Sequence, residues 1–128
     1  MGAIVSLATV GTVVALAGNA RGVETTVRVV EKEMTTSVSP AVVKAGRVTL
    51  VVRNGGTVEH ELVVLVGVGK LAVQRYKAVE TTKLGEVEGV DPGKTKSFTL
   101  TLKPGKYTLL CNVAGHYMLG MHTVLTVR

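Results

Sequence analysis

Alternating apolar and polar residues, interrupted by turn signals, are the feature that most restricts how this 128-residue chain folds. In residues 97–103, Phe98, Leu100 and Leu102 fall on one side, while hydroxyl and lysine side chains fall on the other. Successive side chains of a strand point to opposite faces of a sheet, so this alternation is typical of a strand with one buried face.

Similar runs occur along the rest of the chain, at residues 27–29, 34–38, 47–53, 61–66, 106–111 and 123–127. The run at 61–66 is nearly all apolar, as expected for a central strand buried on both sides. Proline presets φ and glycine accepts positive φ, so the turns between runs are Asn54-Gly55-Gly56, Asp91-Pro92-Gly93 and Pro104-Gly105. About seven to eight short strands with regular turns predict an all-β sandwich, and residues 70–80 are the one short helix candidate.

Length and charge limit the organisation of the chain and its partners. A chain of 128 residues is long enough for one domain with a single core. The net charge of +6 comes from scattered Lys and Arg residues, and aromatic residues are few. This argues against nucleic-acid binding, which needs a clustered basic stripe or stacking aromatic side chains. The basic surface is either simply solvated or attracts an acidic partner.

Residues 1–20 carry no charge and are mostly apolar or small. Ala15-Leu16-Ala17 resembles a cleavage site of the small-x-small type, so a secretory signal or short membrane anchor is expected. The positively charged start of a signal is missing, and the Val, Thr and Gly content also suits a strand. The alternative is an ordered extension that adds an edge strand. The expected division is therefore 1–20 as signal, anchor or extension, and 21–128 as the folded domain.

Four side chains with metal-binding donor atoms stand at the ends of predicted strands. Cys111, His116 and Met121 share one Cys-x4-His-x4-Met stretch, and His60 lies far upstream. Strand parity points three of the four inward, because Cys111, Met121 and His60 alternate in phase with apolar residues. These are Tyr107 and Leu109 for Cys111, Leu125 and Val127 for Met121, and Leu62, Val64 and Val66 for His60. His116 lies on the connecting loop and can fold over the top.

The donor set predicts the metal. Two imidazoles and a thiolate in a trigonal set, with a weak axial thioether, are the ligands of a type 1 copper centre. Zinc is the competitor, but a structural zinc site more often has a fourth Cys or His. Taken alone, His60 suits a strand, Cys111 a small buried apolar position and Met121 a core position. Their spacing together favours one type 1 copper ion.

The stretch from Tyr107 to Met121 resembles the copper loop of the cupredoxins, and its spacing is most similar to the rusticyanin and sulfocyanin branch. The segment from Asn54 to Glu61 resembles the first-histidine segment of the same family, and the resemblance runs from about residue 23 to 128. It implies a Greek-key β-sandwich, one mononuclear copper and the shuttling of single electrons. It also implies that the apolar surroundings of His116 serve as the electron port.

The sequence departs from the family pattern directly after the first histidine. Plastocyanin- and azurin-type members carry an asparagine there, which ties the two ligand segments together, whereas this chain has Glu61. Hydrogen bonds behind the ligands orient them and tune the metal, so Glu61 and Asn112 are candidates for this supporting role. Asn112 follows the cysteine and is a candidate to replace the missing tie.

An electron carrier is the function that these patterns favour, rather than an enzyme. A copper oxidoreductase would need further histidines, and only His122, with outward parity, is left over. A periplasmic copper-delivery protein and a metal-free adhesion module are the competing functions. The expected partners are transient redox proteins, acidic ones included, with membrane contact only if residues 1–20 are an anchor. The expected location is periplasmic or otherwise extracytoplasmic.

Overall fold

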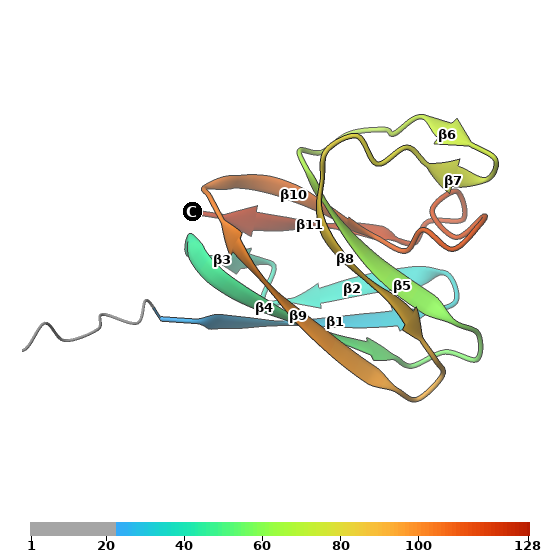
Figure 1. The fold of residues 1–128 in the computed structure, drawn as a ribbon, viewed down its shortest axis with the longest axis horizontal. Coiled ribbons are helices and arrows are strands. Elements are labelled where there is room, and N and C mark those ends of the chain that lie inside the picture. Colours follow the sequence, from blue (N-terminus) through green and yellow to red (C-terminus); the bar gives the residue numbers. More distant parts are fainter. Residues whose placement is uncertain (1–22) are drawn as a thin grey trace, which may run out of the picture.

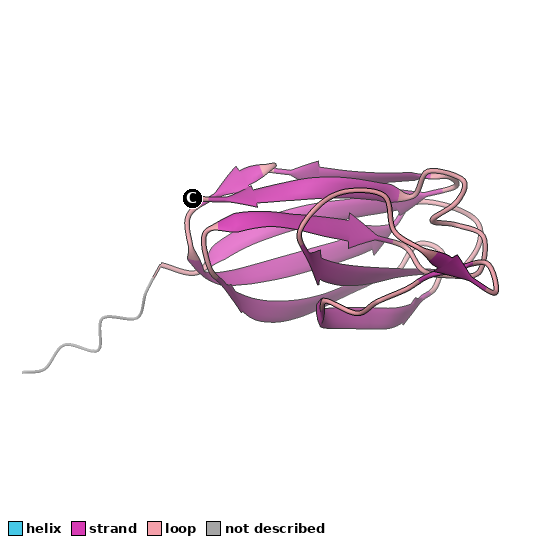
Figure 2. Ribbon diagram, turned by 90° about the horizontal axis from the view of Figure 1, so that it is seen from above, coloured by secondary structure: helices cyan, strands magenta, loops and turns pink. Residues whose placement is uncertain are grey.

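The structure is a computed structural model that describes residues 23–128, so the signal, anchor or extension expected at 1–20 lies outside the described residues. All regular elements of the described part are strands (Figures 1 and 2). They are β1 (Thr25–Lys32), β2 (Thr35–Ser39), β3 (Val42–Val43), β4 (Gly46–Asn54), β5 (His60–Val66), β6 (Val73–Gln74), β7 (Lys77–Ala78), β8 (Lys83–Val90), β9 (Thr95–Leu102), β10 (Gly105–Leu110) and β11 (His122–Val127).

Two mixed sheets pack face to face and form the sandwich that the sequence predicts. One sheet has the order β2-β1-β4-β9, and the other has the order β3-β11-β10-β5-β8. The pairs β1–β4 and β3–β11 are parallel, whereas the other pairs within these sheets are antiparallel. Contacts between β8 and β9, and between β2 and β11, close the two sides of the sandwich.

The main core lies between the two sheets and consists of inward-facing aliphatic residues from both. Its fully buried members include Val27, Val29, Val48, Leu50, Val52, Leu62, Val64, Leu109 and Leu125. These residues follow the two-residue period of their strands, which confirms the inward direction predicted for β5, β10 and β11. Val66 is the exception, because it lies at the end of β5 and is 50% exposed.

A second, smaller apolar cluster covers the outer face of the five-stranded sheet. Val63, Leu65 and Leu110 are buried there beneath Ala78, with Leu71 and Tyr117 packed against them as half-buried neighbours. Ala78 belongs to the small β6–β7 hairpin, which lies over this face of the sheet (Figure 1). The hairpin therefore explains why β5 is apolar on both faces.

The helix predicted for residues 70–80 is wrong, because this segment forms the β6–β7 hairpin. Its turn residues Arg75 and Tyr76 have φ values of 49° and 66°. Positive φ at both central residues is typical of the two-residue type I′ turn, whose twist matches that of the strands of a hairpin. This turn is usually formed by Asn and Gly. Neither Arg nor Tyr favours such a turn, so the sequence does not indicate it. The carbonyl of Tyr76 accepts a 2.7 Å hydrogen bond from the N–H of Gly115, so tertiary contact holds it.

Strand β8 is absent from the sequence prediction, because its residues Lys-Leu-Gly-Glu-Val-Glu-Gly-Val are rich in charge and glycine. It lies at the edge of its sheet, where charged residues discourage pairing with other chains. Gly85 is needed for close packing, since a Cβ atom there would lie 2.9 Å from a methyl carbon of Leu100. Glycine in this strand therefore marks a close approach to β9 rather than a loop.

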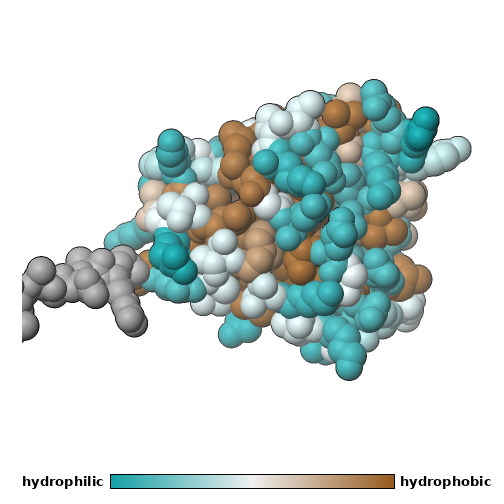
Figure 3. All heavy atoms as spheres, viewed as in Figure 1, coloured by the Kyte–Doolittle hydropathy of each residue, from teal (hydrophilic) through white to brown (hydrophobic). Residues whose placement is uncertain are grey.

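On the face shown in Figure 3, apolar residues lie both in small groups and singly among the polar ones. No helix within residues 23–128 is long and apolar enough to cross a membrane.

Candidate metal centre

Three predicted ligands meet at one end of the sandwich. His60 begins β5, Cys111 follows the last residue of β10, and His116 lies in the loop between β10 and β11. Each contributes one donor atom to a group in which all the donor atoms lie within 4.8 Å of one another. The Cys111 Sγ atom is 3.7 Å from Nδ1 of His60 and 3.4 Å from Nδ1 of His116. All three side chains are buried.

Met121 is connected to two members of this group by backbone hydrogen bonds, and its side chain is buried. Its N–H donates to the carbonyl of His116 at 3.1 Å, and its carbonyl accepts from the N–H of Cys111 at 3.0 Å. The side chain is fully buried, whereas Met118 in the same loop is 56% exposed. The loop thus places Met121, and not Met118, in the interior beside Cys111 and His116.

Burial keeps the cysteine thiol protonated in the metal-free protein. It raises the pKa of Cys111 to about 11, although the backbone N–H groups of Glu61 and Val113 lower this pKa. The Glu61 N–H lies 3.5 Å from the sulfur and links the two ligand segments. The backbone N–H of Glu61, rather than its side chain, therefore connects the His60 segment to the Cys111 segment. The Glu61 carboxyl itself is half-buried, and burial raises its pKa.

Asn112 anchors the ligand loop to the hairpin rather than to the His60 segment. Its amide nitrogen donates to the carbonyl of Ala78 at 3.0 Å and to Oε1 of Glu80 at 2.7 Å. Its amide oxygen accepts from the N–H of Ala78 at 2.8 Å. Asn112 is 2% exposed, so these bonds satisfy an otherwise buried amide.

We expect Asn112→Ala to lower the free energy of unfolding of the metal-free protein by about 1–3 kcal/mol, because it leaves buried backbone groups of Ala78 without partners. Urea denaturation measures this loss. Gln74→Ala, at an exposed position of the same hairpin, is the control and should change stability by less than about 0.5 kcal/mol. Equal stabilities of the two variants would contradict the anchoring role.

Glu33 contacts the site although no sequence pattern points to it. It lies in the turn between β1 and β2, 27 positions before His60. Its Oε1 atom is 3.0 Å from Nε2 of His60 and also accepts the N–H groups of Thr57 and Val58 at 2.8 and 2.9 Å. These hydrogen bonds, led by those from the two backbone groups, lower the pKa of Glu33 to about 2. Glu33 is therefore a carboxylate at neutral pH.

Glu31 is a second acidic residue that the sequence prediction misses, although strand parity could have found it. It follows Val27 and Val29 at two-residue intervals and is likewise fully buried. Thr36 donates its hydroxyl to Oε2 at 2.6 Å, while Oε1 has no hydrogen-bond partner among residues 23–128. Burial raises the pKa of Glu31 to about 7, and its charge in turn raises the pKa of Cys111.

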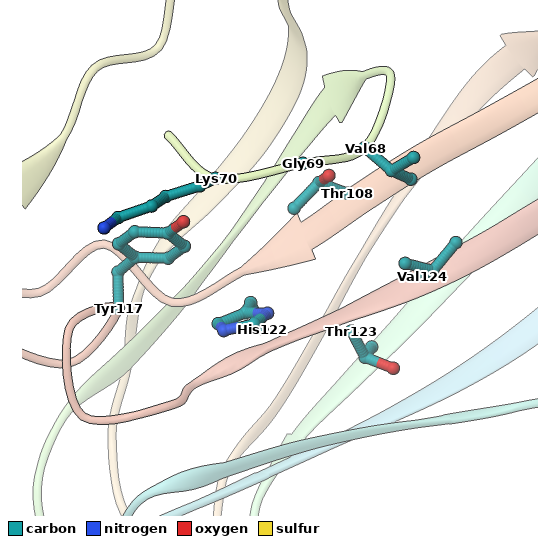
Figure 4. Close-up of a pocket in the computed structure, with 8 residues that line it drawn as sticks. All are labelled: Val68, Gly69, Lys70, Thr108, Tyr117, His122, Thr123 and Val124. Atoms are coloured by element: carbon teal, nitrogen blue, oxygen red, sulfur yellow. The ribbon is translucent and has the colours of Figure 1, made fainter. Parts of the chain in front are cut away.

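His122 faces away from the donor group, as its parity predicts. It lines a surface groove of about 360 Å³ on the outer side of β10 and β11, together with Lys70 and Tyr117 (Figure 4). The rings of His122 and Tyr117 are 5.1 Å apart between centroids. Tyr117 and His116 are neighbours in the ligand loop, so the groove borders the loop without opening into the donor group.

Burial and the adjacent His60 lower the pKa of His116, which favours a neutral, metal-binding imidazole.

The donor chemistry fits copper. A thiol and two imidazole Nδ1 atoms converge on one point, with no carboxylate in this group within residues 23–128, and the thioether of Met121 is buried in the same loop. Hard ions prefer oxygen donors, whereas thiolate and thioether select soft ions such as copper. His60, Cys111 and His116 with Met121 thus fit a single type 1 copper site.

Comparison with known proteins agrees with this fold and site. Residues 3–127 match the family described as Cupredoxin-like domain, so the chain belongs to that family. Comparison with curated proteins found no match.

Solved structures with the same fold include two auracyanins and rusticyanin. Auracyanin of Roseiflexus castenholzii is 23% identical, with 84% of this chain and 99% of the other covered and a TM-score of 0.62. Auracyanin A of Chloroflexus aurantiacus, described as a "blue" copper protein, is 23% identical, with 82% and 99% covered and a TM-score of 0.65. Rusticyanin of Thiobacillus ferrooxidans is 18% identical, with 84% and 79% covered and a TM-score of 0.69.

Proposed function

We propose that this protein binds one copper ion through His60, Cys111, His116 and Met121 and carries single electrons between redox proteins. The observation that carries the proposal is the convergence of Cys111 Sγ with the Nδ1 atoms of His60 and His116 inside 4.8 Å, in a buried site. The membership in the cupredoxin-like family supports it.

The scaffold suits a carrier because it holds the ligands in place before the metal binds. His60 and Cys111 are fixed at the ends of paired strands, and backbone bonds of Met121 fix the loop. Bound copper would accept and release one electron while cycling between its two common oxidation states. The surrounding residues exclude water, and Cys111 must lose its proton for the metal to bind. A site buried and braced in this way is less suited to copper delivery, which needs rapid release.

Electrons would pass through the edge of His116, which is 8% exposed. Met118 and Leu119 of its loop are exposed, and Tyr76 of the hairpin is 70% exposed beside them. Arg75 and Lys77 add positive charge on either side of Tyr76 in the hairpin, and Lys70 lines a groove together with Met118. An apolar patch beside these basic residues supports a transient, acidic redox partner. Attraction between the opposite charges would speed the association of the two proteins, and this effect would weaken as the salt concentration rises.

The location that accords with this role is periplasmic or otherwise extracytoplasmic. The uncharged, mostly apolar residues 1–20 support export or a membrane anchor.

Adding Cu(II) to the metal-free protein should produce an intense visible absorption band that saturates at one equivalent, because thiolate-to-copper charge transfer is specific to a bound cysteine sulfur. Absorbance titration measures it, and the matched control is His122→Asn, whose outward ring should leave the band and the stoichiometry unchanged. A colourless protein that binds Zn(II) tightly would contradict the proposal. Rapid loss of copper to a weak chelator would instead indicate delivery.

A further inference from the structure

One oxygen atom of Glu33 holds both His60 and the segment that leads into it. Oε1 accepts hydrogen bonds from the backbone N–H groups of Thr57 and Val58 and lies 3.0 Å from Nε2 of His60. Thr57 and Val58 lie three and two positions before His60, where the ligand strand begins, so a single carboxylate holds both the ring and the backbone that leads into it. Glu33 itself comes from the β1–β2 turn of the other sheet.

This contact determines which nitrogen of His60 carries the proton. An ionised carboxylate only accepts hydrogen bonds, so Nε2 of His60 must be the protonated nitrogen. Nδ1 is then left with its lone pair, and it faces the Cys111 sulfur at 3.7 Å. His60 is completely buried, so the carboxylate is the group that orients its ring.

Gly56 makes room for the carboxylate. A Cβ atom at this position would lie in contact with Oε1 and Oε2 of Glu33, closer than real side chains approach. The φ angle of Gly56 is not positive, so the backbone does not itself require glycine there. The sequence prediction assigns the glycines of the Asn54-Gly55-Gly56 turn to the φ angles of that turn. For Gly56, the structure shows the space occupied by Glu33 as the reason instead.

We propose that Glu33 is a positioning residue for the copper ligand His60: it fixes the tautomer that presents Nδ1 to the metal, and its negative charge favours Cu(II) over Cu(I). The proposal rests on the proposed function. Carboxylate groups that orient ligating histidines in this way raise the basicity of the ring, and their removal costs about 10–100-fold in metal affinity.

Three variants separate the hydrogen bonds of Glu33 from its charge. Glu33→Gln keeps an oxygen that can accept all three bonds but removes the charge, and Glu33→Ala removes both. Gly56→Ala keeps the charge but displaces the carboxylate. Glu59→Gln is the matched control, because Glu59 is an exposed neighbour of His60. The measurements are ¹⁵N NMR of the His60 ring in the metal-free protein, copper affinity by competition with a chelator, and the reduction potential.

Glu33→Ala and Gly56→Ala should lose the single Nε2-protonated tautomer of His60 and bind copper about 10–100-fold more weakly. Glu33→Gln should keep the tautomer and raise the reduction potential, while Glu59→Gln should behave as the wild type. Wild-type tautomer and affinity in both Glu33→Ala and Gly56→Ala would overturn the proposal. If the wild type binds no copper, the proposed function fails, whereas the NMR of the metal-free protein still tests the bond between Glu33 and His60.

Discussion

Cys111→Ser should abolish the visible absorption of the copper-loaded protein completely. The band requires a sulfur bound to Cu(II), and Cys111 is the only cysteine in the chain. A serine hydroxyl is harder and far less acidic than a thiol, so it is a poor ligand for copper. The variant should therefore bind Cu(II) more weakly through the two histidines that remain. Titration of both proteins with Cu(II), followed by absorbance and by the amount of bound metal, measures this result.

Met118→Leu provides the matched control for that experiment. Met118 contributes a second sulfur to the same loop, but it is 56% exposed. Replacing it should leave the band intact, because buried Met121, and not Met118, is the thioether that would hold the copper. Persistence of the band in Cys111→Ser would refute the ligand set, and loss of the band in Met118→Leu would mean that the loop changes its conformation when the metal binds.

The candidate ligands could be selected from sequence because local rules decide which way their side chains point. Cys111 and Met121 lie at the ends of adjacent strands, and the alternation of Leu109 and Leu125 with their neighbours fixes the direction of both side chains. His60 obeys the same rule on β5. Strand parity therefore decides which way these donors point, even though it says nothing about how far apart they lie.

The supporting residues depend on tertiary contacts that no local pattern records. Arg75 and Tyr76 adopt a left-handed turn that their sequence does not favour, and the bond between Tyr76 and Gly115 holds it. Glu33 lies in an ordinary polar turn, and only the packing of the two sheets brings it to His60. Gly56, which lies against Glu33, looks in the sequence like an ordinary turn glycine. The sequence shows that this position has no side chain, but it does not show that the Glu33 carboxylate occupies the space.

Glu31 is missed for a different reason. Its inward direction can be predicted from strand parity, but a carboxyl group is not expected in a buried position. The parity of Val27 and Val29 extends to Glu31, yet a carboxyl group in a core is costly unless it is neutral or paired. Thr36 pairs only one of its oxygens. Burial raises the pKa of Glu31 to about 7, so the carboxyl group stays protonated and neutral at pH values below about 7.

Glu31→Gln should therefore remove a pH dependence of stability that the wild type shows between about pH 4.5 and 7. The folded protein holds the Glu31 proton up to a pKa of about 7, whereas the unfolded chain loses it near 4.5. Between these values the folded state binds more protons, so the free energy of unfolding contributed by Glu31 falls as pH rises and then levels off. The shift corresponds to about 3 kcal/mol, and the glutamine variant should exceed the wild type by up to that amount at pH 8.

Denaturation of the metal-free proteins in urea from pH 5 to 8 measures this difference, and subtracting one curve from the other cancels the contributions of all groups that the two proteins share. Glu33 does not interfere, because its pKa is lowered to about 2 and its stabilising effect is lost only as pH falls below about 4.5. Glu88→Gln, at an exposed position of β8, is the control and should follow the wild type at every pH. A constant difference between Glu31→Gln and wild type would show that Glu31 titrates normally in the folded protein. A difference that grows with pH would show that a neutral acid is buried in the interior of this protein.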